Sequence, residues 1–331
     1  MCTAISLELN DAYFGRNLDL DASFGEQVVI TPRDFRLLFR MNAPLVMHHA
    51  MVGMARVENR YPLYAEAINE KGIAMAALNF PHNALYATTP IPKLDNLAPF
   101  EVIPWVLGQA GSLSEARALL ERLCVVNLPF RGDLSLTPLH WFITDGKSSL
   151  VLETDQCGVR IYENPLNVLT NNPPFPYQLA FLASYSNLSN QFVSDSFSYF
   201  AGNSAKGLGN GARGLPGDFS SSSRFVRASW LLQQCTGEKV GSEGANVGEL
   251  FALLASVAPI RGSVLTEEGK PHYTIYSCCA NLTKGIFYLK TKNDPQIRQV
   301  DLKKTELQSC ELMIASLSLS DFEKDGAESK V

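Results

Sequence analysis

The sequence lacks the long apolar runs that membrane-spanning helices need. No stretch of its 331 residues approaches the roughly 18 consecutive apolar residues of a transmembrane helix. Glu8, Asn10 and Asp11 interrupt the apolar start, and the first cation is Arg16, which is not the pattern of a secretory signal peptide. We therefore expect no membrane span and a protein that folds in the cytoplasm from its own first residues.

Charge is scarce and nearly balanced. Charged residues make up 18% of the chain, and the net charge of -5 arises from both signs scattered along it. Because no basic face is present, nucleic acid is not an expected partner. Hydrophobic residues make up 46%, which is typical of a folded globular protein, and the length allows one large core or two domains.

Metal-binding and disulfide patterns are also missing. The seven cysteines include no CxxC pair, and adjacent Cys278 and Cys279 have no histidine at ligand spacing. The five histidines show no catalytic or metal spacing, and no Gly-x-Ser-x-Gly elbow supports a serine hydrolase. We expect no metal site and no disulfide scaffold, with most cysteines reduced and buried.

The chain opens with a predicted β-hairpin. Residues 3–9 alternate in polarity, Asn10-Asp11 has turn chemistry, and residues 12–20 return as the paired strand. Cys2 therefore lies at the start of a sheet strand, which is a rigid place for a catalytic group.

Strand patterns at both ends of the chain flank a helical middle. A capping box at 112–115 begins one helix, and helical spacing predicts two more over 222–235 and 247–257. The glycine-rich stretch 202–217 is interpreted as a surface loop, since it does not connect a strand to a helix as a phosphate loop would. These patterns favour a layered architecture with largely antiparallel sheets. Further strands are predicted at 28–31, 72–79, 141–144, 150–153, 158–162, 167–170, 272–277, 286–291 and 299–302.

Cys2 carries two groups that together can cleave an amide. A cysteine thiol titrates near ~8.5 and an α-amino group near ~7.7–8.0, so the amine of the same residue can take the thiol proton. The resulting thiolate is the nucleophile. This chemistry requires removal of Met1, which is normal when the second residue is as small as cysteine. The alternative is that Cys2 merely follows the initiator methionine.

Four further polar residues can support such a nucleophile. The hairpin brings Arg16 and Asp19 back towards Cys2, where an arginine stabilises a thiolate and an aspartate fixes a protonated amine; the alternative is an ordinary strand ion pair. Asn79 and Asn171 end predicted strands and can donate to an oxyanion, or can simply initiate turns before proline.

Arg224 lies in the first turn of a predicted helix. A cation there is poorly matched to the helix dipole, so we expect a specific anionic partner.

The motifs taken together resemble the choloylglycine hydrolases, a family of bile salt hydrolases and penicillin V acylases within the N-terminal-nucleophile superfamily. The resemblance implies an α+β fold, a four-layer αββα sandwich of two largely antiparallel sheets, with no organic cofactor and no metal. It also implies one domain over 2–316 with a protruding assembly loop at about 188–219, a flexible tail at 317–331, and a homotetramer. The motifs are 1–3 (MCT), 14–19 (FGRNLD), 69–72 (NEKG), 78–81 (LNFP), 139–141 (LHW), 168–171 (VLTN), 214–219 (GLPGDF) and 223–225 (SRF).

The resemblance also implies roles for individual residues. Cys2 is the nucleophile and base, and Arg16 and Asp19 are its immediate supports. Asn79 and Asn171 shape the oxyanion hole and the amine environment, and Arg224 completes the polar cluster. An apolar pocket for the substrate is implied at Leu18, Ala65, Phe130, Leu134 and Leu139.

The implied activity is hydrolysis of glycine- or taurine-conjugated bile salts. Asn79 resembles the bile salt hydrolase choice at a position where penicillin V acylases often carry tyrosine. Two alternatives stay open: an acylase for penicillin V or other N-acyl amides, and a non-catalytic bile acid binding protein that keeps the fold and pocket.

Overall fold

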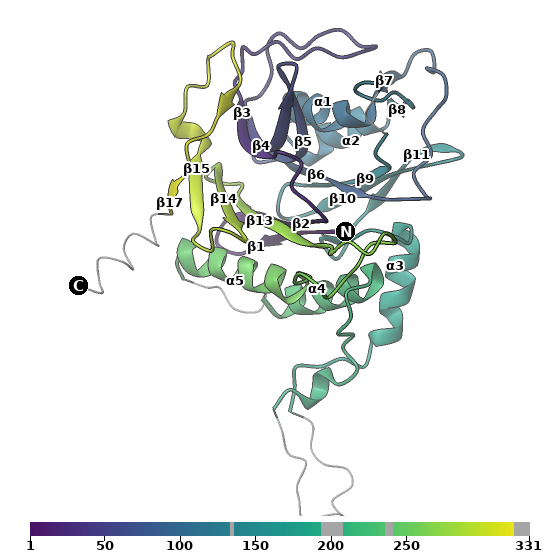
Figure 1. Ribbon diagram of the computed structural model, residues 1–331, viewed down its shortest axis with the longest axis vertical. Helices are drawn as coiled ribbons and strands as arrows, with labels where there is room; N and C mark the ends of the chain where they lie inside the picture. The colour runs from purple at the N-terminus through teal and green to yellow at the C-terminus, as the bar shows by residue number, and fades with distance from the viewer. Residues whose placement is uncertain (133–135, 193–207, 236–240, 321–331) are drawn as a thin grey trace, which may run out of the picture.

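Two antiparallel sheets face each other, and helices cover both outer faces (Figure 1). The computed structural model describes residues 1–132, 136–192, 208–235 and 241–320. Helices α4 (Ser221–Cys235) and α5 (Glu243–Ser256) lie along one sheet, and α1 (Val102–Gln109) and α2 (Leu113–Leu120) lie along the other. The predicted four-layer αββα sandwich is confirmed.

The first sheet contains the opening hairpin next to its short edge strand β12 (Val168–Leu169). Cys2 pairs with Leu18 and Ala4 with Arg16, so the predicted hairpin is confirmed. The second hairpin strand then pairs with a strand from the end of the chain. The sheet order is β12 (Val168–Leu169), β1 (Cys2–Glu8), β2 (Ala12–Leu20), β13 (Tyr273–Asn281), β14 (Ile286–Thr291), β15 (Arg298–Asp301) and β17 (Ser318–Leu319).

The second sheet lies above the first in Figure 1 and carries α1 and α2 on its far side. A small parallel pair, β7 (Asp95–Leu97) and β8 (Leu123–Val125), lies beside it. The sheet order is β11 (Gly158–Glu163), β10 (Ser149–Asp155), β9 (Leu139–Thr144), β6 (Ala74–Asn79), β5 (Tyr61–Asn69), β4 (Met51–Glu58), β3 (Gln27–Thr31) and β16 (Met313–Ile314).

Strands β4 and β5 and helices α1 and α3 (Phe175–Leu182) were not expected from the sequence. The β4–β5 turn uses Asn59 and Arg60 at φ of 50° and 62°, so the glycine that usually marks such a turn is missing. Pro104 lies within the first turn of α1, where a missing N–H costs little. Both features hide regular structure from pattern reasoning.

Apolar side chains fill the layers between these elements. Phe14 of β2 stacks on Phe142 of β9 across the two sheets, with ring centroids 6.4 Å apart. On the far side of the second sheet, Trp141 and Ile143 pack in one buried cluster with Leu107 of α1. Burial of this area is the main stabilising contribution to the sandwich.

The predicted assembly loop at 188–219 and the predicted tail at 317–331 each lie partly outside the described residues. In the predicted assembly loop, Ser189 N–H donates to the Gly211 carbonyl at 2.9 Å, and residues 193–207 lie outside the described residues. Ser318–Leu319, within the predicted tail, pairs with β15, and residues 321–331 are not described. Among the described helices none is long and apolar enough to cross a membrane.

Candidate active site

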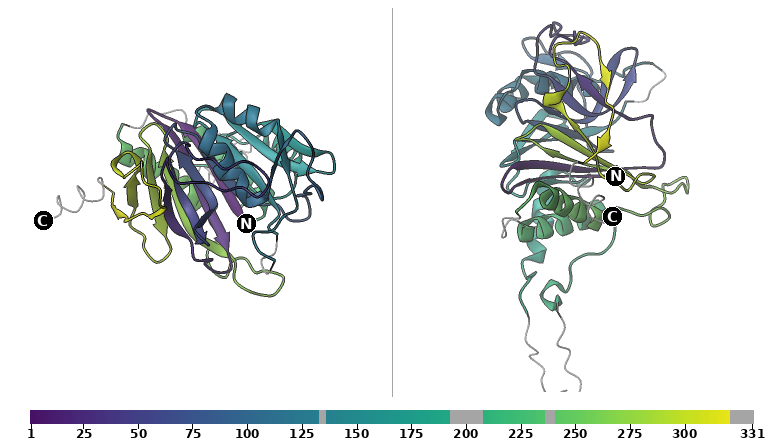
Figure 2. Two further views of the ribbon diagram at one scale, coloured as in Figure 1. Left: turned by 90° about the horizontal axis from the view of Figure 1, so that it is seen from above. Right: turned by 90° about the vertical axis from the view of Figure 1, so that its left-hand side faces the viewer.

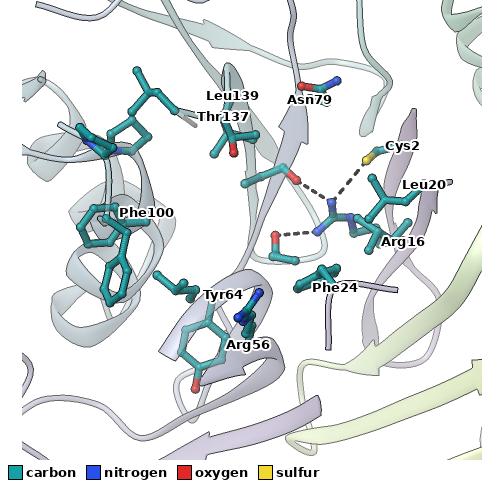
Figure 3. Close-up of a pocket in the computed structure, with 18 residues that line it drawn as sticks. Cys2, Arg16, Leu20, Phe24, Arg56, Tyr64, Asn79, Phe100, Thr137 and Leu139 are labelled. Atoms are coloured by element: carbon teal, nitrogen blue, oxygen red, sulfur yellow. Dashed lines mark hydrogen bonds between the residues drawn. The ribbon is translucent and has the colours of Figure 1, made fainter. Parts of the chain in front are cut away.

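Cys2 begins β1 and is buried between the two sheets, with 3% of its surface exposed. Its Sγ accepts a hydrogen bond from Arg16 Nη2 at 3.4 Å, as Figure 3 shows. Since Arg16 occupies the neighbouring strand in a fixed register, the hairpin itself brings the thiol and the guanidinium together. A thiolate at this position meets a buried cation.

Arg16 is fixed by several acceptors besides the sulfur. Nη1 donates to the Ala65 carbonyl at 2.6 Å and forms an ion pair with Glu66, and Nη2 donates to the Ala77 carbonyl at 2.6 Å. These acceptors come from β5 and β6 of the opposite sheet. The guanidinium therefore crosses the space between the sheets and cannot reorient freely.

Glu66 is a buried charge that the sequence reasoning missed. It is 0% exposed, and Tyr276 Oη donates to both of its carboxylate oxygens at 2.8 and 2.9 Å. The signal was a single glutamate in an otherwise apolar stretch of β5, since buried carboxylates are almost always paired.

Asn171 and Arg224 hold the backbone of Cys2. Asn171 Oδ1 accepts from Cys2 N at 2.7 Å and from Arg224 Nη2 at 2.8 Å. Arg224 Nη1 also donates to the Cys2 carbonyl at 2.5 Å and to Thr3 Oγ1 at 2.8 Å. The hydrogen-bond acceptors of Arg224 are thus neutral oxygens, and the expected anionic partner is Asp19, which interacts with Arg224 through its charge.

Asp19 lies beside the chain terminus and is completely buried. Its Oδ1 accepts from Thr274 Oγ1 at 2.7 Å, whereas Oδ2 is buried without a hydrogen-bond partner among the described residues. The amine present here is that of Met1, which donates to the Asp19 backbone carbonyl at 3.0 Å and lies 2.6 Å from His272 Nε2. Among the described residues, the Asp19 carboxylate therefore accepts no hydrogen bond from an amine.

Asn79 ends β6 at the cavity next to Cys2 (Figure 3). Its backbone carbonyl accepts from Asn171 Nδ2 at 2.7 Å, which joins the two predicted asparagines in one network. The six predicted polar residues, Cys2, Arg16, Asp19, Asn79, Asn171 and Arg224, consequently meet in one region of the molecule.

Electrostatics favour ionisation of the thiol. Burial would raise the pKa of the Cys2 thiol, but Arg16 and the terminal amine outweigh it and the pKa is lowered. Burial also raises the pKa of Asp19 despite Arg224, and lowers the pKa of the Met1 amine. The Cys2 thiol is therefore easier to ionise than an ordinary cysteine although it is buried.

A cavity of about 510 Å³ reaches Cys2. Of the five predicted pocket residues, four line it, and Leu134 lies outside the described residues. Arg56, which the sequence reasoning missed, contributes a charge to a mostly apolar lining (Figure 3). The lining residues are Cys2, Arg16, Leu18, Leu20, Phe24, Arg56, Leu63, Tyr64, Ala65, Ala77, Asn79, Pro99, Phe100, Pro129, Phe130, Leu136, Thr137 and Leu139.

No cluster of three or more potential metal ligands is found within the part of the chain that the structure describes. The free cysteines at 278 and 279 are buried in β13, and burial raises the pKa of both thiols well above the ordinary value. Cys2 differs from both, because its pKa is lowered and it lines a cavity.

Known proteins are similar to this chain in both sequence and fold. A family model described as linear amide C–N hydrolases, choloylglycine hydrolase family, matches residues 2–315. The bile salt hydrolase/transferase of Lactiplantibacillus plantarum is 42% identical over 313 residues, covering 95% of this chain and 96% of that protein. The conjugated bile acid hydrolase of Lactobacillus gasseri is 34% identical, covering 91% of this chain and 96% of that protein.

Solved structures agree with these matches. The crystal structure of the mutant C2A conjugated bile acid hydrolase from Clostridium perfringens has a TM-score of 0.88 at 31% identity, covering 96% of this chain and 97% of that one. Penicillin V acylase from Agrobacterium tumefaciens has a TM-score of 0.74 at 18% identity, covering 94% and 90%, which shows the fold alone.

Proposed function

Because the chain belongs to the choloylglycine hydrolase family of linear amide C–N hydrolases, we propose that it hydrolyses glycine- or taurine-conjugated bile salts with Cys2 as nucleophile. The observation that carries the proposal is the Cys2 sulfur, which accepts a hydrogen bond from Arg16 and lines a largely apolar cavity. A steroid needs such a cavity to bury its apolar face.

The reaction begins after Met1 has been removed and the α-amine of Cys2 is free. The thiolate attacks the amide carbonyl carbon, forming the carbon–sulfur bond of a tetrahedral intermediate whose oxyanion is held by Asn79 and a backbone N–H. The α-ammonium group, which holds the thiol proton, passes it to the departing nitrogen as the carbon–nitrogen bond breaks. Glycine or taurine leaves, and a thioester remains.

Water then completes the cycle. The α-amine takes a proton from water, the hydroxide oxygen attacks the thioester carbonyl, and the carbon–sulfur bond breaks. The bile acid leaves and the thiol is restored. Asn171 Oδ1, 2.7 Å from Cys2 N, orients this nitrogen, and the unpartnered Asp19 Oδ2 is available to accept from the free ammonium group.

A substrate panel tests the assignment. Initial rates on glycocholate, taurocholate and penicillin V, at equal enzyme concentration, should favour the two bile salts. A higher kcat/KM for penicillin V would favour the acylase alternative, which would use the same cysteine. Bile acid binding without turnover of any of the three amides would favour the non-catalytic alternative.

We also propose that the protein acts as a homotetramer in the cytoplasm, with the segment at about 188–219 taking part in assembly. Support comes from the described part of this segment, which projects from the α3 side of the sandwich (Figure 2). Light scattering on the purified chain should give the mass of four copies. A monomeric mass at micromolar concentration would contradict this proposal without affecting the reaction.

A further inference from the structure

The carboxylate of Glu66 lies directly behind the arginine that contacts the nucleophile. We infer that Glu66 is a positioning residue that offsets the charge of Arg16 and thereby sets how readily the Cys2 thiol loses its proton. The inference rests on the proposed function, since it concerns the same sulfur. It assigns a role to a residue of β5 that does not line the cavity at Cys2.

The guanidinium of Arg16 contacts Cys2 with one nitrogen and Glu66 with the other. Arg16 Nη2 donates to Cys2 Sγ at 3.4 Å, and Nη1 forms the ion pair with Glu66. Cys2, Arg16 and Glu66 are exposed by 3%, 1% and 0%. Because water does not screen this line of groups, a change of charge at Glu66 is felt at the sulfur.

Glu66 is itself held by the opposite sheet. Tyr276 Oη donates to both carboxylate oxygens, and Cys278 Sγ donates to Oε1 at 3.5 Å. Both donors lie on β13, whereas Glu66 lies on β5, so the carboxylate bridges the two sheets. Burial raises the pKa of Glu66, and the charge of Arg16 with the hydrogen bonds from Tyr276 and Cys278 acts against that rise by stabilising the carboxylate in a fixed position.

The charge balance around the sulfur depends on this carboxylate. The charged groups that act on Cys2 are Arg16 and Asp19 from β2, Arg224 from α4 and the terminal amine. Glu66 from β5 contacts Arg16, Tyr276 and Cys278 from β13 contact Glu66, and His272 lies against the amine. With Glu66, two guanidinium groups face two carboxylates. Without it, they face Asp19 alone.

An uncompensated Arg16 would make the thiolate too stable. The intrinsic nucleophilicity of a thiolate falls as the pKa of its thiol falls, with a Brønsted coefficient of about 0.4–0.5. A thiol pKa lowered by one unit therefore costs the ionised nucleophile about threefold in rate. Glu66 keeps Arg16 strong enough to ionise the thiol at neutral pH and weak enough to leave it reactive.

The central experiment replaces Glu66 by glutamine in the Met1-processed enzyme. Glu66→Gln keeps the side-chain shape and removes the negative charge, so the thiol pKa should fall by about one unit. The pH dependence of iodoacetamide alkylation at Cys2 measures this pKa, and the acidic limb of kcat/KM on glycocholate should move in the same direction. Above both pKa values, the alkylation rate should fall about threefold.

Two matched variants control for burial and folding. Glu153 is a second buried carboxylate, bonded to Phe175 N at 2.9 Å and to His140 Nδ1 at 3.2 Å, and Glu153→Gln should leave the thiol pKa unchanged. Tyr276→Phe removes a donor that stabilises the ionised carboxylate of Glu66. It should lower the thiol pKa by roughly a few tenths of a unit, in the same direction as Glu66→Gln, and it keeps the inference testable if Glu66→Gln does not fold.

The outcomes separate the inference from the proposed function. A fall in thiol pKa in Glu66→Gln, with a smaller fall in Tyr276→Phe, supports the inference. An unchanged or raised thiol pKa in folded Glu66→Gln overturns it, as does a raised thiol pKa in Tyr276→Phe. Activity that persists without the Cys2 thiol would instead overturn the proposed function.

Discussion

The region around Cys2 and the layer beneath α1 are equally buried but are built from opposite chemistry. Arg16, Glu66 and Arg224 are at most 1% exposed, yet each carries a formal charge. In the layer beneath α1, Trp141 and Leu107 are also fully buried, and their neighbours there are apolar. Burial alone therefore does not distinguish a stabilising core from a site.

The difference between the two regions lies in what burial does to each. Apolar area removed from water stabilises the sandwich by roughly 25 cal/mol per Å². Burying charge costs free energy that pairing only partly offsets. The apolar layers around the charged cluster at Cys2 therefore supply the free energy that keeps it folded. Mutations in the first region should change the chemistry, and mutations in the second should change the stability.

The largest expected effect is on the Cys2 side of this comparison. Cys2→Ala removes the nucleophile, so turnover of glycocholate should fall by about 10⁴-fold or more. Its free energy of unfolding should change little, because alanine fills most of the same space. Steady-state rates and urea denaturation measure the two quantities, and turnover within tenfold of the wild type would contradict the mechanism.

Asn171→Ala should have the next largest effect on the same side. Loss of Oδ1 leaves both the Cys2 nitrogen and Arg224 Nη2 without their shared acceptor. Since this nitrogen handles the proton, kcat should fall by about 10²–10³-fold with a smaller change in KM. An unchanged kcat with a raised KM would mean that Asn171 serves substrate binding alone.

Leu107→Ala tests the apolar side of the comparison. Leu107 is fully buried on α1, and truncation of such a leucine costs about 2–5 kcal/mol of unfolding free energy. The enzyme that remains folded should keep its kcat within about twofold, since Leu107 itself does not line the cavity at Cys2. Urea titration measures the loss of unfolding free energy, and initial rates on glycocholate measure kcat. A large loss of kcat in the folded fraction would contradict the claim that this layer affects stability and not chemistry.

The smallest effect concerns pH in chains that retain Met1. Burial and the charged terminal amine lower the pKa of His272 to about 4, below the value near 6.5 of an unfolded chain. The unfolded state therefore binds more protons between these two pH values. The contribution of His272 to the free energy of unfolding is fully present above pH 6.5 and is lost as the pH falls towards 4. His272→Gln should flatten this part of the stability–pH curve; an identical slope in thermal melts would contradict the assignment.

Local patterns predicted the parts of the molecule that are built locally. The opening hairpin follows from alternation and a turn, and it alone brings Arg16 to Cys2. Ser112 caps α2 by accepting from Glu115 N at 3.2 Å, as the capping box predicted.

The site residues that the sequence did not predict owe their positions to packing between segments that are distant in the chain. Glu66 reaches Arg16 across 50 residues of sequence and Tyr276 across 210, because the two sheets press together there. No periodicity in either strand encodes that contact. Arg56 lines the cavity from β4, a strand that was not predicted because its turn to β5 lacks a glycine.

The account rests on Cys2 being the free first residue of the active chain and the carrier of the acyl group. Intact-mass spectrometry of the purified enzyme, followed by rapid acid quenching during glycocholate turnover, tests this directly. We expect a chain without Met1 and a transient adduct of one cholyl group, located by peptide mapping on Cys2. Full activity in a chain that keeps Met1, or an adduct on another residue, would contradict the account.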